Sequence, residues 1–154
     1  MRQLGNILWH IPFLGFLTSL FTFLIGSILV LTVVGAPLGL GLIQLSKFLL
    51  SPFTTSMVDK KQLNVEQNKY WKSYGLIIRI IYFPFGLGLA VTTIFQIVLL
   101  FISIIGIPVA VILSKSLGTY FNPVNKKCVP RAVSKELEKR KAKDQVDKYL
   151  GDTN

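Results

Sequence analysis

The sequence predicts an all-α integral membrane protein of two tandem helical hairpins, followed by a further helix at a cytoplasmic C-terminus. The hairpins contribute four hydrophobic helices, and the second helix of each pair is expected to be short or re-entrant. Composition is the first reason, because 51% of the 154 residues are hydrophobic and 16% are charged, whereas soluble domains typically carry about 25% charged residues. Placement is the second reason, because no Asp, Glu, Lys or Arg lies between Arg2 and Lys47 or between Arg79 and Lys115.

The two apolar segments are too long for single membrane crossings. They cover residues 7–46 and 80–114, which are 40 and 35 residues long, and one crossing needs about 20 residues. Each segment must therefore fold back on itself.

A Gly-x-Pro sequence marks the point where each apolar segment is expected to turn. Gly35 and Pro37 occupy it in the first segment, and Gly106 and Pro108 occupy it 71 residues later. Proline cannot donate the helical hydrogen bond, and glycine adopts turn angles that other residues avoid. We therefore predict that these four residues form structural corners, and we interpret the matched spacing as an internal duplication of one unit of about 45 residues.

Each unit is expected to contain a lead-in, a long apolar helix, a corner and a shorter apolar helix. The lead-ins are predicted at residues 6–15 and 76–86, the long helices at 16–34 and 87–105, and the shorter helices at 38–51 and 109–121. Four regions follow: a first membrane repeat (1–53), a basic cytoplasmic linker (54–75), a second membrane repeat (76–124) and a basic cytoplasmic tail (125–154).

The basic residues indicate which ends of the hairpins face the cytoplasm. Residues 47–79 hold six basic and two acidic side chains, and residues 115–154 hold ten and five. Because Lys and Arg collect in short cytoplasmic loops, both segments and both termini are expected on that side, and each hairpin must enter and leave there. Aromatic side chains near the ends of apolar segments are expected to form an interfacial belt, and these are Trp9, Trp71, Tyr74, Tyr82 and Tyr120.

Two lysines in the shorter helices leave the depth of the hairpins open. Lys47 follows Pro37 by ten residues, and Lys115 follows Pro108 by seven. If the corners reach the far surface, these lysines lie near mid-bilayer, which costs about 2.5–3.5 kcal/mol for each on insertion scales. If the hairpins are re-entrant, the lysines reach the cytoplasmic interface directly or by snorkelling. We favour the interfacial position.

The basic tail is predicted to be helical over residues 131–150. Ser134 is a candidate N-cap, and Glu136 and Arg140 form an i,i+4 pair in the favourable acid-first order. A thin apolar stripe is expected from Val133, Leu137, Val146, Tyr149 and Leu150. Such a helix is either solvated or contacts another helix or an anionic lipid surface.

Catalytic chemistry is not expected. His10 is the single histidine and Cys128 the single cysteine, so the sequence offers no His pair for a metal, no nucleophile–base set and no intramolecular disulfide. We predict no cofactor and no metal site. His10 is either an interfacial structural residue or a pH sensor, because imidazole titrates near neutrality. Gln44 and Gln96 lie in apolar surroundings, where an amide either bonds between helices or lines a water-filled path.

The residues also resemble a known family. Residues 1–9 (MRQLGNILW), the SIIGIP sequence at residues 103–108, and two Ser-Lys helices ending in SPF and NPV are similar to the YccF family of bacterial inner-membrane proteins. The resemblance covers about residues 1–129, although the first corner, TVVGAPLG, departs from the second. It implies a small multi-pass protein of the cell inner membrane with a cytoplasmic C-terminus, and it implies no catalytic residues.

Three functions are compatible with these features. We favour a homo-oligomeric channel or permeation protein in which Lys47, Lys115, Gln44 and Gln96 line the polar path, since a ring of lysines favours anions. The alternatives are a non-conducting scaffold or accessory subunit that recruits a cytoplasmic partner through its basic tail, and a lipid-organising protein with wedge-like hairpins. The expected partners are membrane lipids, with anionic lipids as one option, further copies of the chain and a protein at the tail. Nucleic acid is not expected.

Overall fold

A computed structural model describes residues 2–11, 15–63 and 69–151 of the chain. The helices are α1 (Arg2–His10), α2 (Gly15–Leu31), α3 (Ala36–Leu50), α4 (Lys69–Ile102), α5 (Ile107–Phe121) and α6 (Arg131–Gly151). Between them lie two 3-10 turns, η1 (Lys60–Leu63) and η2 (Ile104–Gly106), and two strands, β1 (Thr55–Asp59) and β2 (Lys126–Pro130). The chain is thus mostly helical with several apolar helices, in agreement with the predicted class, but it also contains a small sheet.

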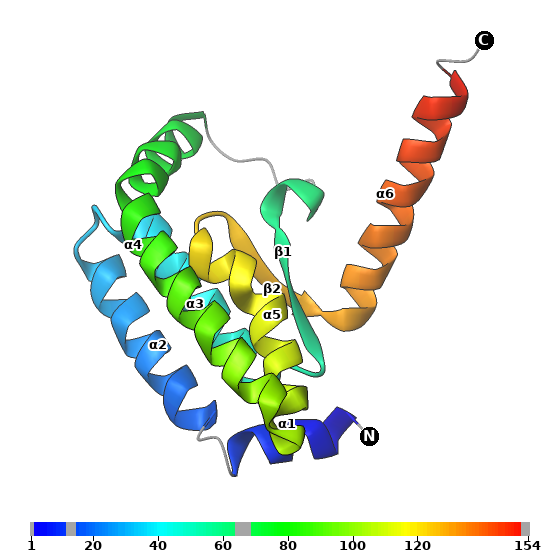
Figure 1. The fold of residues 1–154 in the computed structure, drawn as a ribbon. Coiled ribbons are helices and arrows are strands. Elements are labelled where there is room, and N and C mark those ends of the chain that lie inside the picture. The colour runs from blue at the N-terminus through cyan, green and yellow to red at the C-terminus, as the bar shows by residue number, and fades with distance from the viewer. Residues whose placement is uncertain (1, 12–14, 64–68, 152–154) are drawn as a thin grey trace.

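Helices α2 and α3 pack as one hairpin and α4 and α5 as another (Figure 1). The two hairpins run in opposite directions, so the turn of the first lies toward the end of the molecule where α4 begins (Figure 1). The inner helices α3 and α5 provide most of the core. The buried apolar cluster consists of Trp9, Leu45, Phe48, Leu49, Ile97, Val109, Ala110, Ile112 and Leu113.

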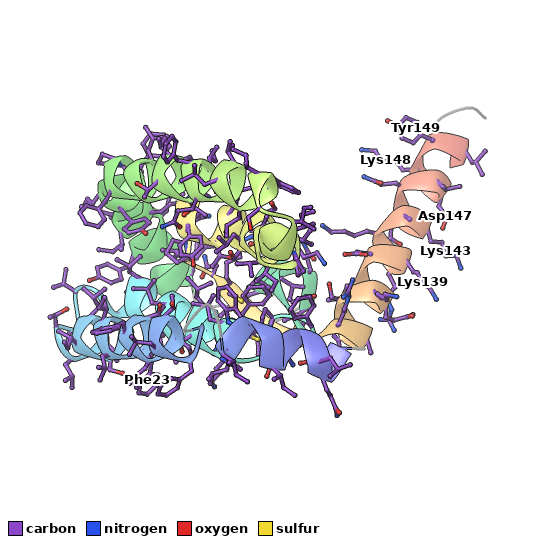
Figure 2. The ribbon with its side chains drawn as sticks, turned by 60° about the horizontal axis from the view of Figure 1, so that its bottom comes forward. Phe23, Lys139, Lys143, Asp147, Lys148 and Tyr149 are labelled. Atoms are coloured by element: carbon purple, nitrogen blue, oxygen red, sulfur yellow. The ribbon has the colours of Figure 1, made fainter. Side chains whose placement is uncertain are left out.

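Helices α2 and α4 expose large apolar side chains along their length. These include Phe21, Ile28, Ile81 and Phe95, and Figure 2 shows Phe23 pointing outward from α2. Extended exposed apolar surface of this kind marks contact with a membrane or a partner. Among the described residues, one helix, Lys72–Ile102, is long and apolar enough to cross a membrane. The helices α2, α3 and α5 have 17, 15 and 15 residues, which is shorter than the roughly 20 needed for one crossing.

The turns that open α3 and α5 have matching geometry. Gly35 and Gly106 precede these helices with φ angles of −80° and −77°, and a proline lies in the first turn of each helix, where its missing N–H removes no helix bond. We expected glycine here for its freedom of backbone angle, but these φ values are open to any residue. The glycines are needed for close approach, because an added Cβ would lie 2.9 Å from the Leu29 carbonyl oxygen or 2.5 Å from that of Leu100.

Strands β1 and β2 form an antiparallel pair that the sequence did not predict. Met57 lies opposite Cys128 at the centre of the pair. The strands TSMVD and KKCVP are short and lack a strict alternation of apolar and polar residues, which is the usual signal of a half-buried strand. The sheet joins the segments that we expected to be a separate linker and tail, so these form one structural unit.

The inner helices and the strands repeat at one interval. The bounds of α5 and β2 lie 71 residues after those of α3 and β1. Beyond the two ends of the sheet, the Lys60 N–H donates to the Asn125 carbonyl and the Arg131 N–H donates to the Thr54 carbonyl, each at 2.9 Å. Each of these bonds becomes the other when both of its residues are replaced by their counterparts 71 positions away. A two-fold relation between two similar units produces this exchange.

The outer helices differ between the two halves of the chain. Helix α4 runs unbroken from Lys69 to Ile102 with Pro84 inside it, so the predicted lead-in at residues 76–86 is not a separate element. Proline removes one helical hydrogen bond, but the residues on both sides of it continue the same helix. In the first half, α1 and α2 are separate helices, and the predicted lead-in extends over residues 12–14, which lie outside the described residues.

Helix α6 stands apart from the helical bundle, as predicted for a tail helix (Figures 1 and 2). It begins at Arg131, so Ser134 is not its N-cap; Ser134 lies one turn inside and is 7% exposed. The predicted ion pair is present, with 3.7 Å between Arg140 Nε and Glu136 Oε1.

Candidate functional site

Gln44, which we expected on a polar path, holds the sheet against α3. Its Oε1 accepts a hydrogen bond from the Cys128 N–H at 3.1 Å. That N–H belongs to a cross-strand pair whose neighbours outside the sheet carry the ladder bonds, so Gln44 satisfies a backbone donor that the partner strand does not. The amide therefore connects two segments that are 84 residues apart in the chain.

The two lysines lie close to the sheet and the tail helix. Lys47 is exposed in the last part of α3 and lies within electrostatic reach of Cys128. Lys115 is exposed in α5, with Arg131 and Glu138 of the sheet–α6 junction as its charged neighbours. The lysines do not occupy equivalent positions, because α3 and α5 are related by 71 residues and the lysines are 68 residues apart.

Gln96 lies far from the other candidate path residues in the sequence and points outward. Its side chain is exposed on α4, within the apolar span Lys72–Ile102. Within the described part of the chain it has no hydrogen-bond partner. Gln44 and Gln96 thus serve different surroundings, one bonded to a strand and the other at the surface, and the single chain does not bring the four candidates together around one path.

Two aromatic residues expected in an interfacial belt are core residues that cap helix ends. Trp9 is 4% exposed, and its Nε1–H donates to the Leu49 carbonyl at 2.8 Å. Tyr82 is buried, and its Oη donates to the Tyr120 carbonyl at 3.1 Å. The last four carbonyls of a helix lack partners within it, so these rings satisfy the C-terminal ends of α3 and α5. The belt prediction is wrong for Trp9 and Tyr82 because an aromatic N–H or O–H at an apolar boundary served a buried carbonyl.

The other aromatic residues have mixed positions. The Tyr74 Oη donates to the Val34 carbonyl at 2.7 Å, which places it against the turn of the first hairpin. Tyr120 is half-buried and packs against the apolar core. The side chain of Trp71 lies outside what the structure describes.

His10 and Cys128 occupy structural positions. The His10 Nε2 lies 2.9 Å from the Leu50 carbonyl oxygen, next to the carbonyl that Trp9 caps. Cys128 is half-buried in β2, and burial raises the pKa of its thiol, opposed by a hydrogen bond with Thr55 and by the charge of Lys47. In the described part of the chain, no three His, Cys, Asp or Glu side chains gather as metal ligands would.

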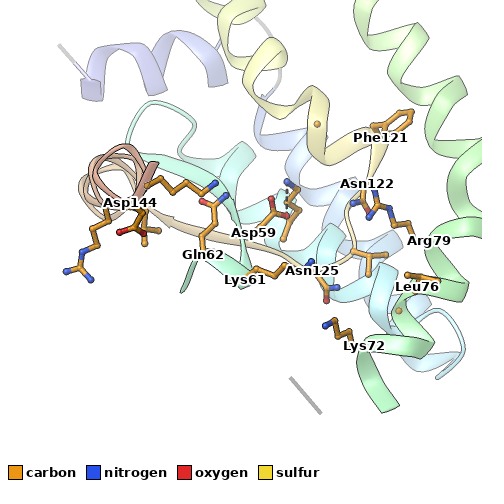
Figure 3. A pocket seen from close by; sticks show the side chains of 17 residues that line it. Asp59, Lys61, Gln62, Lys72, Leu76, Arg79, Phe121, Asn122, Asn125 and Asp144 are labelled. Carbon is orange, nitrogen blue, oxygen red and sulfur yellow. Dashed lines mark ion pairs between the residues drawn. The ribbon is translucent and has the colours of Figure 1, made fainter. Parts of the chain in front are cut away.

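A basic cavity is the feature that sequence reasoning missed. Figure 3 shows it between the start of α4, the end of α5, the sheet and the first half of α6. Its volume is about 830 Å³. Six cationic side chains line it, namely Lys61, Lys72, Arg79, Lys126, Arg140 and Lys141, together with the carboxylates Asp59 and Asp144. The signal was the basic excess of residues 47–79 and 115–154; what was missing was the strand pairing that brings the two segments together.

The exposed apolar helices and the polar face built from the sheet and α6 define a membrane protein. The family model described as YccF, inner membrane component domain, matches residues 4–55. The chain belongs to this family through that segment, as the resemblance indicated, and the description places it in the inner membrane. Among curated proteins and among solved structures, none matches the chain.

Proposed function

We propose that this chain is a non-catalytic, non-conducting membrane scaffold whose α6 helix recruits an acidic segment of a cytoplasmic protein. The observation that carries the proposal is the position of α6. The helix has 21 residues and one buried residue, Ser134. It is held at its start, where the Arg131 N–H bonds to the Thr54 carbonyl, and the remainder extends from the bundle (Figure 1).

The outer face of α6 suits a partner helix or strand. Val146, Tyr149 and Leu150 are 54%, 79% and 63% exposed, and their i, i+3, i+4 spacing puts them on one face. Leu137 lines the basic cavity instead, and nine residues, or two and a half turns, separate it from Val146. The apolar stripe that we expected is therefore divided between two opposite faces of the helix.

The charge of α6 selects the kind of partner. The helix carries seven basic and four acidic residues, and basic residues such as Lys139, Lys143 and Lys148 are distributed around it (Figure 2). Complementary charge steers association and excludes like-charged surfaces. An acidic amphipathic segment therefore fits this face, with an apolar stripe for Val146 and Leu150 and carboxylates beside it.

The membrane arrangement we propose has the N-terminal helix, the sheet and the tail on the cytoplasmic side. The β1–β2 pairing requires the middle segment and the tail to share one side. Helix α1 is tied to the same region, because the Phe53 N–H donates to Asn6 Oδ1 at 3.2 Å. The basic excess of these segments assigns that side to the cytoplasm. The two hairpins are then re-entrant copies of a duplicated unit, since α2, α3 and α5 are shorter than a full crossing.

A photo-crosslinking experiment in cells tests the scaffold function. A crosslinking amino acid replaces Ala142, one turn before Val146 on the same face, in the full-length chain. We expect one dominant adduct to a protein with an acidic segment, and a synthetic peptide of that segment should bind the purified chain and dissociate as salt is raised. The pair Val146→Ser and Leu150→Ser should remove the adduct. Lys148→Ser, on the opposite side of α6, should retain it.

Two outcomes contradict the scaffold proposal. One is an adduct that persists unchanged in the Val146→Ser, Leu150→Ser variant. The other is ion flux through liposomes that contain the purified chain, above the flux of protein-free liposomes, because a scaffold conducts nothing.

A homo-oligomeric channel is the second candidate, and the exposed Gln96 favours it. An amide on a lipid-facing helix surface is costly unless a neighbouring helix supplies a hydrogen bond, and a second copy of α4 would supply one. The particle mass in mild detergent, measured by native mass spectrometry, is the first test. A ring of several copies with ion flux, and with charge preference reversed by Lys47→Glu and Lys115→Glu, would support the channel. A monomer without flux would exclude it.

A further inference from the structure

We propose that the basic cavity binds a phosphate-bearing anion with hydroxyl groups beside the phosphate, as in a phosphoglycerol group. The inference does not depend on the partner proposed for α6, because the α6 residues that line the cavity lie on the face opposite Val146 and Leu150.

The charge in the cavity is largely uncompensated. Asp59 is occupied by Lys126, with 3.0 Å between Nζ and Oδ1. Within residues 15–63 and 69–151, no carboxylate lies at ion-pair distance from Lys61, Lys72 or Arg79. Several cations around one concave space attract an anion more strongly than the same cations on a flat surface, because low-dielectric walls focus the field.

Arg79 and Lys72 supply complementary donors on one face of α4. They are seven residues apart, two turns of helix, and both point toward the cavity in Figure 3. The guanidinium presents parallel N–H groups that match two phosphate oxygens, and the ammonium adds a compact charge. Phosphate is the oxyanion that uses both.

Asn122 indicates that the ligand also carries a hydrogen-bond donor. Its side chain lines the cavity, and its buried Oδ1 has no hydrogen-bond partner. An unpartnered buried acceptor costs free energy that a ligand donor would recover. A bare phosphate dianion offers no donor, whereas a hydroxyl next to the phosphate does.

Two glycines leave room for the ligand. Gly118 and Gly75 line the cavity. A Cβ added at Gly118 would meet nothing within 4 Å, and one at Gly75 would touch Val124 at 3.4 Å. The space is therefore open beside α5, and a side chain added at Gly118 would occupy it without altering any charge.

The cavity lies at the depth of lipid headgroups. Arg79 is followed at once by Ile80 and Ile81, which are exposed apolar residues, so the cavity is at the polar limit of the apolar surface of α4. Basic pockets at the cytoplasmic ends of membrane helices suit phospholipid headgroups. The same chemistry also accommodates a soluble glycerol phosphate, and the experiment distinguishes the two sources.

Native mass spectrometry of the full-length chain in zwitterionic detergent provides the test. The probes are dioleoylphosphatidylglycerol, dioleoylphosphatidylcholine as the neutral comparison, and glycerol 1-phosphate. Arg79→Gln and Gly118→Leu remove charge and space, respectively. Lys127→Gln removes an equal charge from an exposed residue of β2 outside the cavity. Gly88→Leu adds an equal side chain at a glycine of α4 with nothing within 4 Å.

We expect phosphatidylglycerol adducts to exceed phosphatidylcholine adducts, and Arg79→Gln and Gly118→Leu each to weaken them about tenfold, the effect of losing one charge-assisted contact. Lys127→Gln and Gly88→Leu should leave binding unchanged. Displacement by glycerol 1-phosphate would assign the site to a soluble ligand, and its failure to displace would assign it to the lipid. The proposal is overturned if neither probe binds preferentially, or if Lys127→Gln weakens binding as much as Arg79→Gln. If Gly118→Leu does not fold by circular dichroism, Arg79→Gln against Lys127→Gln decides.

Discussion

Tyr74 and Val34 are joined across the two hairpins, since the Tyr74 Oη donates to the Val34 carbonyl oxygen at 2.7 Å. Val34 belongs to the turn between α2 and α3, and Tyr74 lies near the start of α4, among the basic residues of that segment. The turn of the first hairpin is therefore level with the polar end of α4. An arrangement in which this turn lies at the far membrane surface, away from the basic segments, does not accommodate the contact.

Removing the Tyr74 hydroxyl should loosen the two hairpins. Tyr74→Phe deletes the bond to Val34 and is expected to lower the free energy of unfolding by about 1 kcal/mol, which is a fall of about 2–4 °C in Tm for a chain of this size. Differential scanning fluorimetry in detergent measures it. Tyr70→Phe is the matched control, because Tyr70 is 86% exposed. Equal shifts in the two variants would contradict the contact.

The strand register predicts a new disulfide. Met57 lies opposite Cys128, and the Cys128 N–H bonds to Gln44 rather than across the ladder. In such a non-hydrogen-bonded pair the side chains are close, with Cα atoms about 4.5 Å apart, a separation within disulfide range. Met57→Cys should lose both free thiols on mild oxidation, counted by maleimide labelling and mass.

Ser56→Cys is the control for this pairing. Ser56 lies opposite Val129, and adjacent residues of a strand point to opposite faces of a sheet. Its thiol should therefore remain free, together with that of Cys128. A disulfide in Ser56→Cys and none in Met57→Cys would show that the register is wrong.

The two glutamines should respond oppositely to an apolar replacement. Gln44→Leu leaves the Cys128 N–H without its acceptor, which costs about 1–3 kcal/mol and should lower Tm. Gln96→Leu removes an exposed amide from an apolar surface and should leave Tm unchanged or raise it. Thermal unfolding of the two variants in the same detergent is the comparison. A larger loss for Gln96→Leu would indicate that Gln96 has a partner, as an oligomer supplies.

Cys128 should make the fold less stable at alkaline pH. Its thiol pKa is raised in the folded chain by burial, so the folded state holds this proton more tightly than the unfolded state. Stability is then unaffected at neutral pH and falls as the pH rises above the ordinary value for cysteine, about 8.5. Unfolding by urea between pH 7 and about pH 10 should show this fall, and Cys128→Ser should remove it. An equal fall in Cys128→Ser would assign the effect to other groups.

Local signals located much of the fold. The shorter helices were expected at residues 38–51 and 109–121, and α3 and α5 lie within about two residues of these limits, because proline and glycine act on their own stretch of backbone. Helix α6 was found for the same reason: its charge spacing and Glu136–Arg140 pair are contained within the helix.

Features with distant partners were missed. The strands carry no strong strand pattern, and each is recognisable only beside the other, 71 residues away. Trp9 and Tyr82 have the composition of an interfacial belt, and nothing near them in the sequence shows that Leu49 and Tyr120 present unbonded carbonyls. The basic cavity was missed in the same way, since net charge along a chain does not say which charges face one another.

The strand pairing also determines the order in which the chain is completed during synthesis. Strand β2 leaves the ribosome 71 residues after β1, a delay of roughly 4–14 s at 5–20 residues per second. Throughout this interval β1 is an open edge, able to pair with any available strand, and Gln44 has no amide to accept from. The segment matched by the family model ends at residue 55, before most of β1, so it is an unfinished half whose missing strand is supplied by the remainder of the nascent chain.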